Sequence, residues 1–330
     1  MTPGNAKKII GVGLLSGGLD SLLAAKILLD QGVCVTGLSF KSPFFGLKKA
    51  LAAAQELGIP LIVKDITQEH LKIVKNPRYG YGANMNPCID CHALMIREAG
   101  KLMEEKGYDF IFTGEVLNQR PMSQTRSSLR LVAKFSGYAD FLLRPLSARL
   151  LPETKPEKLA LVDRERLLDI QGRSRKNQLA LAREYGLREY SNPAGGCLLT
   201  DPNFSRRLKE LFDHNPDCSI SSIELLKIGR HFRINGEKVV IGRNKEENDL
   251  LKKMRGEKDI VLSAEHIPGP VALISGGGPE ALIKKVAGMC ARYSDAKDLN
   301  TQPIIYKIND PPEEISPPLI TESDLTSWRI

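Results

Sequence analysis

A short apolar segment that runs into a glycine-rich turn and then a helix restricts the fold of this chain more than any other feature. Residues Lys7–Leu15 (KKIIGVGLL) form a short apolar run, which is typical of a strand buried on both faces of a parallel sheet. The turn Ser16–Asp20 holds two adjacent glycines, and Ser21–Gln31 then carries apolar residues at helical spacing up to Gly32. A buried strand, a tight turn and a helix in this order predict the first βαβ unit of an α/β fold.

The alternation of strand-like and helix-like segments continues through the first half of the chain. Strands are predicted at Val33–Phe40, Leu61–Lys64 and Phe110–Thr113, and helices at Leu47–Leu57 and His92–Lys106. This alternation predicts an α/β fold with a doubly wound parallel sheet. Ligands bind at the carboxyl ends of the strands in such sheets.

The pattern changes at Asn192–Gly196 (NPAGG), a turn-rich break. Helices are then predicted at Asn203–Asp213, Ser221–Lys227 and Glu280–Arg292, and strands at Arg233–Ile234, Val239–Ile241, Ile260–Ser263 and Val271–Ser275. Asn235-Gly236 is a strong hairpin-turn signal, and this half is predicted to be a smaller α+β domain. The predicted boundaries are 1–198 and 199–308, followed by a proline-rich, mostly acidic tail at 309–330 that we expect to be extended.

The composition excludes several classes of protein. Of the 330 residues, 26% are charged and 42% hydrophobic, which argues against a disordered, fibrous or membrane protein. No stretch approaches the roughly 20 apolar residues of a membrane span, and polar residues interrupt the N-terminal apolar run, so no signal peptide is predicted. We therefore expect a cytoplasmic protein with no membrane partner. The net charge of +8 weakly favours an anionic partner.

The turn after the first strand has the chemistry of a phosphate-binding loop. It reads Ser16, Gly17, Gly18, Leu19, Asp20, Ser21. The glycines bring backbone N–H groups close to an anion, the helix N-terminus adds partial positive charge, and Asp20 is suited to holding Mg²⁺ or orienting the loop. Neither GxxxxGK[ST] nor GxGxxG fits these residues. A second glycine-rich turn, Ser275–Pro279 (SGGGP), lacks a following polar ligand and is interpreted as structural.

A cysteine pair, Cys88-Ile89-Asp90-Cys91-His92, permits four interpretations. Haem attachment is disfavoured by the missing export signal. A thioredoxin-like pair, a structural zinc site completed by Cys197, and sulfur chemistry with a third cysteine remain. Cys197 follows two glycines and is the natural third member. Cys34 and Cys290 lie in apolar segments and are expected in the core.

Several motifs in a fixed order resemble a known family. They are the hexapeptide SGGLDS, Asn86-Pro87-Cys88-x-x-Cys91, Thr113-Gly114-Glu115, Gln119, Ser123-Gln124-Thr125 and Arg144-Pro145-Leu146. The hexapeptide resembles the PP-loop of the ATP pyrophosphatase superfamily, and the ordered set resembles the tRNA 4-thiouridine synthetases; the cysteine pair also resembles that of tRNA 2-thiouridylases. The resemblance covers about residues 7–200 and implies a Rossmann-like PP-loop domain. It also implies ATP and Mg²⁺ as cofactors, adenylation of a uridine carbonyl oxygen, release of pyrophosphate, and displacement of AMP by sulfur.

The resemblance also implies roles for individual residues. The ATP ligands are Ser16, Gly17, Gly18, Leu19, Asp20, Ser21, Gly114, Glu115 and Gln119, and the catalytic residues are Asp20, Cys88, Cys91 and Cys197. Iron–sulfur-dependent members hold a [4Fe–4S] cluster with a CxxC pair and one distant cysteine, a layout matched by Cys88, Cys91 and Cys197. A zinc site or a persulfide on Cys197 is the alternative. The implied sulfur donor is sulfide or a persulfide derived from a cysteine desulfurase. Asn118 replaces a glycine expected in the GExxGQ segment.

Two basic segments are candidates for RNA contact. Ile228–Arg233 and Val240–Asn244 resemble the RNA-binding domain of the NFACT family, and residues 227–258 hold ten Lys/Arg against five Asp/Glu. Such side chains neutralise phosphates, so Arg230, Arg233 and Arg243 are predicted RNA ligands. A second stretch consists of Arg120, Arg126, Arg130 and Lys134, with no acid between them. The alternative is a solvated charged surface.

These observations predict an ATP-dependent tRNA thiolation enzyme, a tRNA sulfurtransferase. One alternative is another PP-loop synthetase that modifies a nucleobase or forms an amide and uses the cysteines for structural zinc. A second alternative is a non-catalytic RNA-binding protein. The intact hexapeptide argues against the last.

Overall fold

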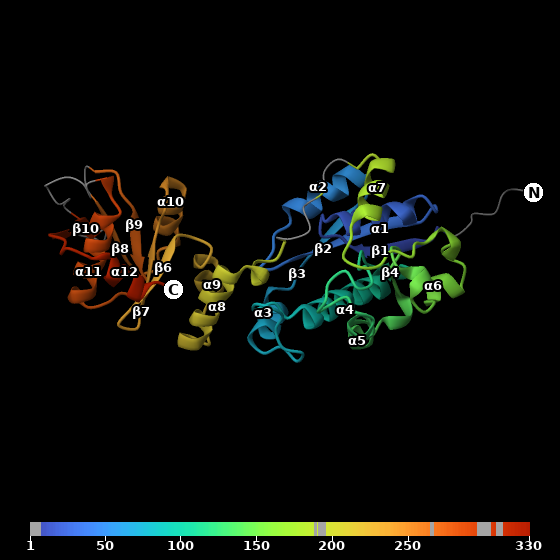
Figure 1. Ribbon diagram of the computed structural model, residues 1–330, viewed down its shortest axis with the longest axis horizontal. Coiled ribbons are helices and arrows are strands. Elements are labelled where there is room, and N and C mark those ends of the chain that lie inside the picture. Colours follow the sequence, from blue (N-terminus) through green and yellow to red (C-terminus); the bar gives the residue numbers. More distant parts are fainter. Residues whose placement is uncertain (1–7, 188–189, 191–195, 265–266, 296–304, 308–312) are drawn as a thin grey trace, which may run out of the picture. The chain divides into compact units, whose positions relative to one another are not determined.

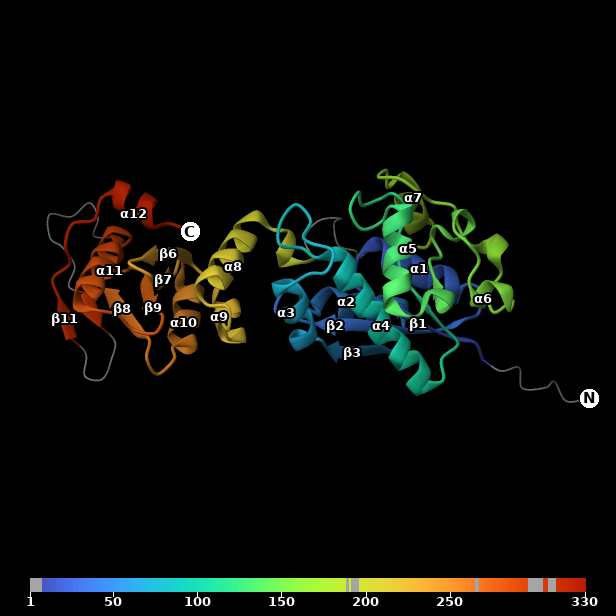
Figure 2. The same cartoon turned by 90° about the horizontal axis from the view of Figure 1, so that it is seen from below.

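The computed structural model describes residues 8–187, 190, 196–264, 267–295, 305–307 and 313–330. The chain divides into two compact units, Met1–Asp201 and Pro202–Ile330. Figures 1 and 2 show both units. The turn-rich break predicted at Asn192–Gly196 lies largely outside the described residues.

The first unit is built on a parallel sheet. Its described strands are β1 (Ile10–Leu14), β2 (Cys34–Lys41), β3 (Leu61–Asp65), β4 (Phe110–Phe112) and β5 (Leu142–Leu143). In the described residues they form a five-stranded sheet in the order β3-β2-β1-β4-β5, and every pairing is parallel. The chain adds β2 and β3 on one side of β1 and then adds β4 and β5 on the other side, so the strand order reverses between β1 and β4. This order confirms the predicted α/β fold with a doubly wound parallel sheet.

Helices cover both faces of this sheet, as Figure 1 shows. They are α1 (Leu19–Leu29), α2 (Lys48–Leu57), α3 (Thr67–Lys75), α4 (Cys88–Lys106), α5 (Arg126–Ser136), α6 (Lys155–Lys158) and α7 (Lys176–Glu184). One apolar core lies between the sheet, α1 and α7, and a second lies between the sheet, α4 and α5. Neighbouring residues of β4 alternate between them: Phe110 and Phe112 belong to the first core and Ile111 to the second.

Two glycines of β1 have a packing role. A Cβ at Gly11 would lie 2.9 Å from the ring of Phe110, and a Cβ at Gly13 would lie 2.1 Å from the ring of Phe112. The glycines therefore leave room for the two rings of β4 to lie across β1.

Three details of the first unit differ from the sequence-based expectation. Helix α4 begins at Cys88, so the cysteine pair is in its first turn and not ahead of the helix. Helices α3 and α7 were not predicted, because their sequences are mostly polar. Cys34 is exposed, so its predicted place in the core is wrong: it is the first residue of β2, at the end of the sheet where β2 begins.

The second unit contains an antiparallel sheet. Its strands are β6 (Arg230–Ile234), β7 (Glu237–Ile241), β8 (Ile260–Ala264), β9 (Val271–Ile274), β10 (Ile305–Lys307) and β11 (Glu313–Ile315). The described strands form a six-stranded sheet in the order β11-β10-β8-β9-β7-β6. The helices are α8 (Pro202–His214), α9 (Ile220–Leu225), α10 (Lys245–Met254), α11 (Glu280–Arg292) and α12 (Glu322–Trp328). The predicted α+β class is confirmed, and Asn235 and Gly236 both adopt positive φ in the β6–β7 turn.

The final segment is folded where the structure describes it. We expected an extended tail over 309–330, of which 309–312 lie outside the described residues. Residues 313–330 contain β11 and α12, and Leu325 of α12 is fully buried in the core of the second unit. Apolar side chains of this segment are buried, and its prolines and acidic residues concealed this folded structure in the sequence. Across the residues described here, every helix is too short or too polar to span a bilayer.

Candidate functional site

The predicted phosphate loop connects β1 to α1 at the carboxyl end of β1. Gly17 has φ +75°, and a Cβ there would lie 2.3 Å from the backbone oxygen of Lys49. Only glycine fits this position without displacing α2. The hydroxyl of Ser21 donates to the backbone oxygen of Gly18 at 2.8 Å and lies 3.4 Å from the hydroxyl of Ser16, which is exposed. The loop thus keeps its backbone close-packed while one hydroxyl faces the solvent.

Asp20, in the first turn of α1, is the centre of a polar network at this loop. Its Oδ2 atom accepts hydrogen bonds from Gln119 Nε2 and from a terminal nitrogen of Arg175, each at 2.8 Å. Gln178 Nε2 in turn donates to Gln119 Oε1 at 2.9 Å. Asp20 Oδ1 is buried and has no hydrogen-bond partner among the described residues. A buried carboxylate oxygen without a partner is costly, and an oxygen of this kind fits a Mg²⁺ ligand.

The segment after β4 is pressed against the same loop. A Cβ at Gly114 would lie 2.5 Å from the backbone carbon of Asp20, so this close approach requires glycine. Asn118 adopts φ +59°, a left-handed conformation that glycine and asparagine adopt most readily. The replacement of the expected glycine by Asn118 therefore preserves the loop, and Gln119 still reaches Asp20.

Glu115 lies behind this loop and is buried. Its Oε2 accepts hydrogen bonds from Arg144 Nε at 2.8 Å and from the Thr113 hydroxyl at 3.1 Å, and its Oε1 accepts one from His92 Nδ1 at 2.8 Å. Burial alone would raise the pKa of Glu115. The charge of Arg144 and the hydrogen bond from His92 outweigh burial and lower the pKa to about 2. The carboxylate is thus charged at neutral pH and joins the loop after β4 to α4. Among the described residues, no contact joins it to the phosphate loop itself.

The three predicted cysteines occupy one neighbourhood. Cys91 Sγ lies 2.8 Å from His70 Nε2, and the ring of Phe44 packs against His70. Burial, followed by the charges of Cys197 and Cys88, raises the pKa of Cys91 well above its usual range. Backbone and side-chain contacts hold the two segments together. Leu198 N–H donates to the Phe44 carbonyl at 2.9 Å, and Asn84 Nδ2 donates to the Thr200 carbonyl at 2.9 Å.

The thiol environments differ between the three positions. Cys91 is buried, whereas Cys88 and Cys197 are partly exposed. Burial raises the pKa of Cys197 to about 11, although the nearby positive charge of Arg120 opposes this shift. Among the described residues, no group of three or more His, Cys, Asp or Glu side chains is arranged to hold a metal ion. Thiolates are donors both to iron–sulfur clusters and to zinc, so the donor chemistry of the three cysteines fits either group.

His70 of α3 contacts the cysteines and was missed by the sequence analysis. It is fully buried, and its Nε2 lies 2.8 Å from Cys91 Sγ while its Nδ1 lies 2.8 Å from the Ser42 hydroxyl. The rings of Phe44 and Phe45 pack against it, and burial lowers the pKa of His70 to about 4. A neutral imidazole therefore links Ser42 to Cys91.

Arg175 and Gln178 were also missed, although they complete the network of Asp20. They lie at the start of α7, and Arg175 is 155 positions from Asp20. No periodicity or spacing connects such distant residues. The weak signal available was a cluster of basic residues ahead of a polar helix.

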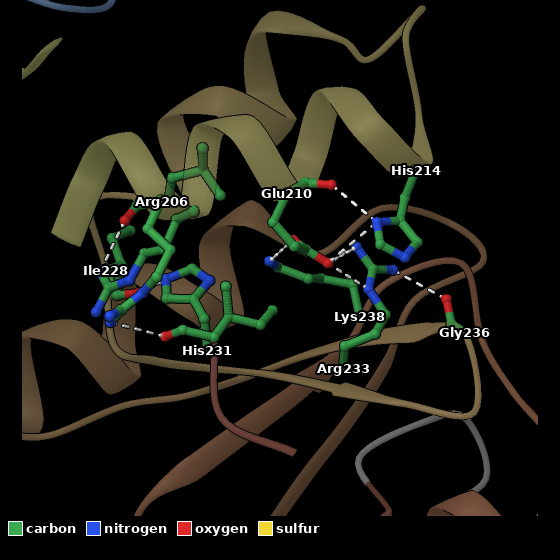
Figure 3. A network of polar contacts seen from close by, with 11 residues as sticks. Arg206, Glu210, His214, Ile228, His231, Arg233, Gly236 and Lys238 are labelled. Carbon is green, nitrogen blue, oxygen red and sulfur yellow. Dashed lines mark hydrogen bonds and ion pairs between the residues drawn. The ribbon is translucent and has the colours of Figure 1, made fainter. Parts of the chain in front are cut away.

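The predicted RNA ligands of the second unit are engaged in internal contacts. Figure 3 shows Glu210 of α8 between Arg233 and Lys238 of the β6–β7 hairpin. Glu210 accepts from Arg233 Nε at 2.6 Å and from Lys238 Nζ at 2.7 Å. Arg243 pairs with Glu247, and the guanidinium of Arg230 lies 4.7 Å from the ring centre of Tyr293. Each of the three arginines thus has a partner within the second unit, and their role in RNA binding stays a prediction.

The basic stretch of the first unit has the opposite character. Arg120, Arg126, Arg130 and Lys134 are all exposed, and none forms an ion pair within the described part of the chain. Arg126, Arg130 and Lys134 follow one another at intervals of four residues on α5, which places them on one helix face.

Comparison with known families divides the chain in the same way. Residues 7–149 match the family model described as "Thiamine biosynthesis protein (ThiI)". The match covers the phosphate loop, the cysteine pair and the Glu115–Arg144 centre. Residues 229–329 match the model described as "NFACT protein RNA binding domain", so the two family matches fall on the two different units of the chain.

Curated relatives are similar in sequence to part of this chain. A tRNA-specific 2-thiouridylase MnmA of Syntrophotalea carbinolica is 35% identical over 118 residues, which are 30% of this chain and 32% of that protein. A tRNA-specific 2-thiouridylase MnmA of Marinobacter nauticus is 24% identical over 249 residues, 70% of this chain and 59% of that protein. The chain thus spans between about a third and three-fifths of the length of these relatives. A solved 4-thiouridine synthetase–RNA complex with bound ATP is 22% identical, with a TM-score of 0.36, over 65% of this chain and 52% of that chain.

Proposed function

We propose that this chain is an ATP-dependent tRNA thiolation enzyme, a tRNA sulfurtransferase that acts in the cytoplasm. The observation that carries the proposal is the PP-loop with a buried, unpartnered Asp20 oxygen, on the same unit as three neighbouring cysteines. The family match of residues 7–149 and the 2-thiouridylase relatives support it. Such a reaction requires an activated oxygen on the base and a sulfur nucleophile beside it.

In the first half-reaction the PP-loop binds ATP and the pyrophosphate leaves. The backbone N–H groups of Gly17 and Gly18, the hydroxyls of Ser16 and Ser21, and the N-terminus of α1 would together bind the phosphates. Leu19, Gly114, Glu115 and Gln119 complete the predicted ATP site. Asp20 Oδ1 would hold Mg²⁺, while Gln119 and Arg175 fix the orientation of its other oxygen. The uridine oxygen attacks the α-phosphorus, the bond to the pyrophosphate breaks, and an adenylated base forms.

In the second half-reaction sulfur attacks the adenylated carbon and AMP leaves. Cys88, Cys91 and Cys197 would hold a [4Fe–4S] cluster, which supplies an iron free to bind a hydrosulfide. The alternative sulfur carrier is a persulfide on Cys197 with the cysteine pair resolving it. The sulfur donor is sulfide in the first route and a persulfide derived from a cysteine desulfurase in the second. Anaerobic purification with iron and sulfide analysis distinguishes the two routes, because an active enzyme without iron requires the persulfide route. Normal thiolation by a Cys197→Ala variant would contradict both routes.

The second unit would supply RNA contact. The NFACT match of residues 229–329 and the excess of basic residues at 227–258 favour this role. A chain that lacks residues 202–330 should bind tRNA more weakly than the full chain if the proposal is right. Equal binding would place the RNA contact elsewhere.

The PP-loop assignment is tested by pyrophosphate release from ATP in the presence of tRNA. We expect Asp20→Ala and Ser16→Ala to lower the rate by about 100-fold or more, since an electrostatic contact made in the transition state is worth about 3 kcal/mol. Ser275→Ala, in the glycine-rich turn of the second unit, is the matched control and should keep the rate of the natural protein. Unchanged release in both PP-loop variants would remove the assignment.

A further inference from the structure

Six exposed cations of the first unit lie on or around α5. Elsewhere in this unit several lysines and arginines pair with acids, as Lys64 does with Glu98 and Arg164 with Glu157. The cations around α5 do not. Arg78, Arg97, Arg120, Arg126, Arg130 and Lys134 are exposed, and none of the six forms an ion pair within the described part of the chain.

These six cations belong to one surface, here called the α5 face. Arg126, Arg130 and Lys134 line one side of α5, so neighbouring charges are about 6 Å apart along the helix axis. At the end of α5 the guanidinium of Arg78 lies 4.6 Å from the ring centre of Phe135, and Arg97 of α4 donates to the Phe135 carbonyl at 2.8 Å. Figure 2 shows α4 and α5 packed together in the first unit. Residues separated by more than 50 positions in the sequence therefore extend the same row.

The α5 face adjoins the cysteine pair at its Arg78 end. Tyr79 N–H donates to Asp90, which lies between the two cysteines of the pair, at 3.1 Å, and the Tyr79 ring centre lies 5.1 Å from that of Phe135 at the end of α5. At the other end, Arg120 precedes α5 by a short turn, in which Gln124 N–H donates to the Arg120 carbonyl at 3.0 Å. The preceding residue, Gln119, reaches Asp20 of the phosphate loop. The row thus extends along α5 between the cysteine pair and the phosphate loop.

Acids are absent from the segments that form most of this face. Residues 76–89 and 116–139 contain five Lys/Arg and no Asp or Glu. Exposed cations in a row repel one another. Arg97 and Arg126 donate to backbone carbonyls and Arg78 lies over the ring of Phe135, but none has an acidic partner within the described part of the chain. Each can instead neutralise a phosphate, which releases condensed counterions and favours binding of a nucleic acid. The arginines of the second unit contrast with them, because Arg233 and Arg243 already pair with acids.

We propose that the α5 face is the phosphate-contact surface along which the tRNA backbone approaches the cysteines. The inference rests on the proposed function and adds the track by which its substrate is held. It predicts that contacts made by the catalytic unit, and not only those of the NFACT-type unit, set the salt dependence of tRNA binding.

Binding of fluorescently labelled tRNA to the full chain, measured by anisotropy over a series of salt concentrations, tests the proposal. The variant carries Arg126→Gln, Arg130→Gln and Lys134→Gln together. Log K falls as log salt rises, and each lost phosphate contact should make this slope shallower by roughly 0.7–0.9. For the triple variant we therefore expect a slope shallower by about 2 and much weaker binding at low salt. These side chains are exposed, and thermal unfolding will show whether the variant keeps its fold; the single Arg130→Gln variant, with a slope smaller by about 0.8, provides a milder test.

A matched triple variant removes three exposed cations elsewhere on the first unit, Lys106, Lys158 and Arg183. Its substitution by glutamines measures how much a loss of three charges matters in itself. A larger fall in slope for the α5 variant than for this control variant supports the α5 face. An α5 variant that binds with the slope and affinity of the natural protein overturns the inference and leaves the proposed function standing. Absence of tRNA binding by the natural protein overturns both.

Discussion

At the scale of single residues, Glu115 explains why separate sequence motifs occur together. Its carboxylate binds Thr113 of its own segment, His92 of the cysteine segment and Arg144 of the Arg-Pro-Leu segment. Arg144 continues to the carbonyl of Leu129 in α5 at 3.1 Å. One buried carboxylate thus fixes the first turn of α4, with its cysteines, relative to the loop after β4.

The lowered pKa of Glu115 makes a prediction about stability. Because the carboxylate has a pKa of about 2 in the folded protein and an ordinary pKa of 4.5, its stabilisation is complete above about pH 4.5 and is lost as the pH falls towards 2. Glu115→Gln should lower the free energy of unfolding at pH 7 by about 3 kcal/mol. Denaturant unfolding at pH 7 and pH 3 measures this. The exposed Glu105→Gln is the control, and a Glu115→Gln effect that is the same at both pH values would contradict the account.

His70 makes a prediction about the second half-reaction alone. Its hydrogen bond holds Cys91 Sγ in place, and loss of a residue that orients a functional ligand typically costs 10- to 100-fold. His70→Leu should therefore lower thiolation by roughly 10- to 100-fold and leave pyrophosphate release unchanged. His70→Gln, which keeps an N–H donor, should recover part of the loss. If both half-reactions fall equally, His70 serves only the fold.

At the scale of elements, the β6–β7 hairpin is joined to α8 by a half-buried charge cluster. Burial lowers the pKa of Lys238 to about 8, while its contact with Glu210 opposes this shift. Glu210→Gln would leave Lys238 and Arg233 without their shared counter-charge, and breaking a buried pair costs about 3–5 kcal/mol. We expect a loss of about 3 kcal/mol in the unfolding free energy of the second unit, measured by thermal or denaturant unfolding.

The pair of Arg243 and Glu247 provides the control for this cluster. Arg243 is half exposed, and surface ion pairs contribute less than about 1 kcal/mol. Glu247→Gln should therefore change the unfolding free energy little. A Glu210→Gln variant as stable as Glu247→Gln would show that the cluster does not hold the hairpin to α8.

Much of the element order follows from local sequence patterns. The strands β1–β4 have apolar runs and the helix α11 has a regular apolar spacing, and both were predicted within a few residues. The helices α3, α7 and α10 are rich in polar residues, so their apolar faces are too narrow to stand out from a single sequence. Helix α12 was hidden by neighbouring prolines and acids, although a capping box at Thr321 and Asp324 starts it.

The candidate site likewise combines residues that are adjacent in the sequence with residues that are far apart in it. The phosphate loop and the cysteine pair are contiguous, so their chemistry can be predicted from the sequence. His70, Arg175 and Gln178 act through contacts made only when distant elements pack together. The internal pairing of Arg233 and Arg243 is likewise invisible in a count of charges, which records Glu210 and Glu247 as ordinary surface acids.

At the scale of the whole molecule, the chain combines a unit that resembles the ThiI family with a unit that resembles the NFACT RNA-binding domain. The family matches fall on the two compact units of the structure. The α5 face adds a basic surface to the unit with the cysteines. The proposed tRNA thiolation assigns ATP binding, sulfur transfer and RNA contact to these parts.

Mass spectrometry of tRNA nucleosides from a strain that lacks the gene tests this account most directly, because it requires no choice of sulfur donor. One thiolated uridine should be missing from the tRNA of the deletion strain. The natural gene should restore it, and genes encoding Asp20→Ala or Cys197→Ala should not. A complete set of thiolated uridines in the deletion strain, or full restoration by Asp20→Ala, would contradict the claim that this chain uses its PP-loop to thiolate tRNA.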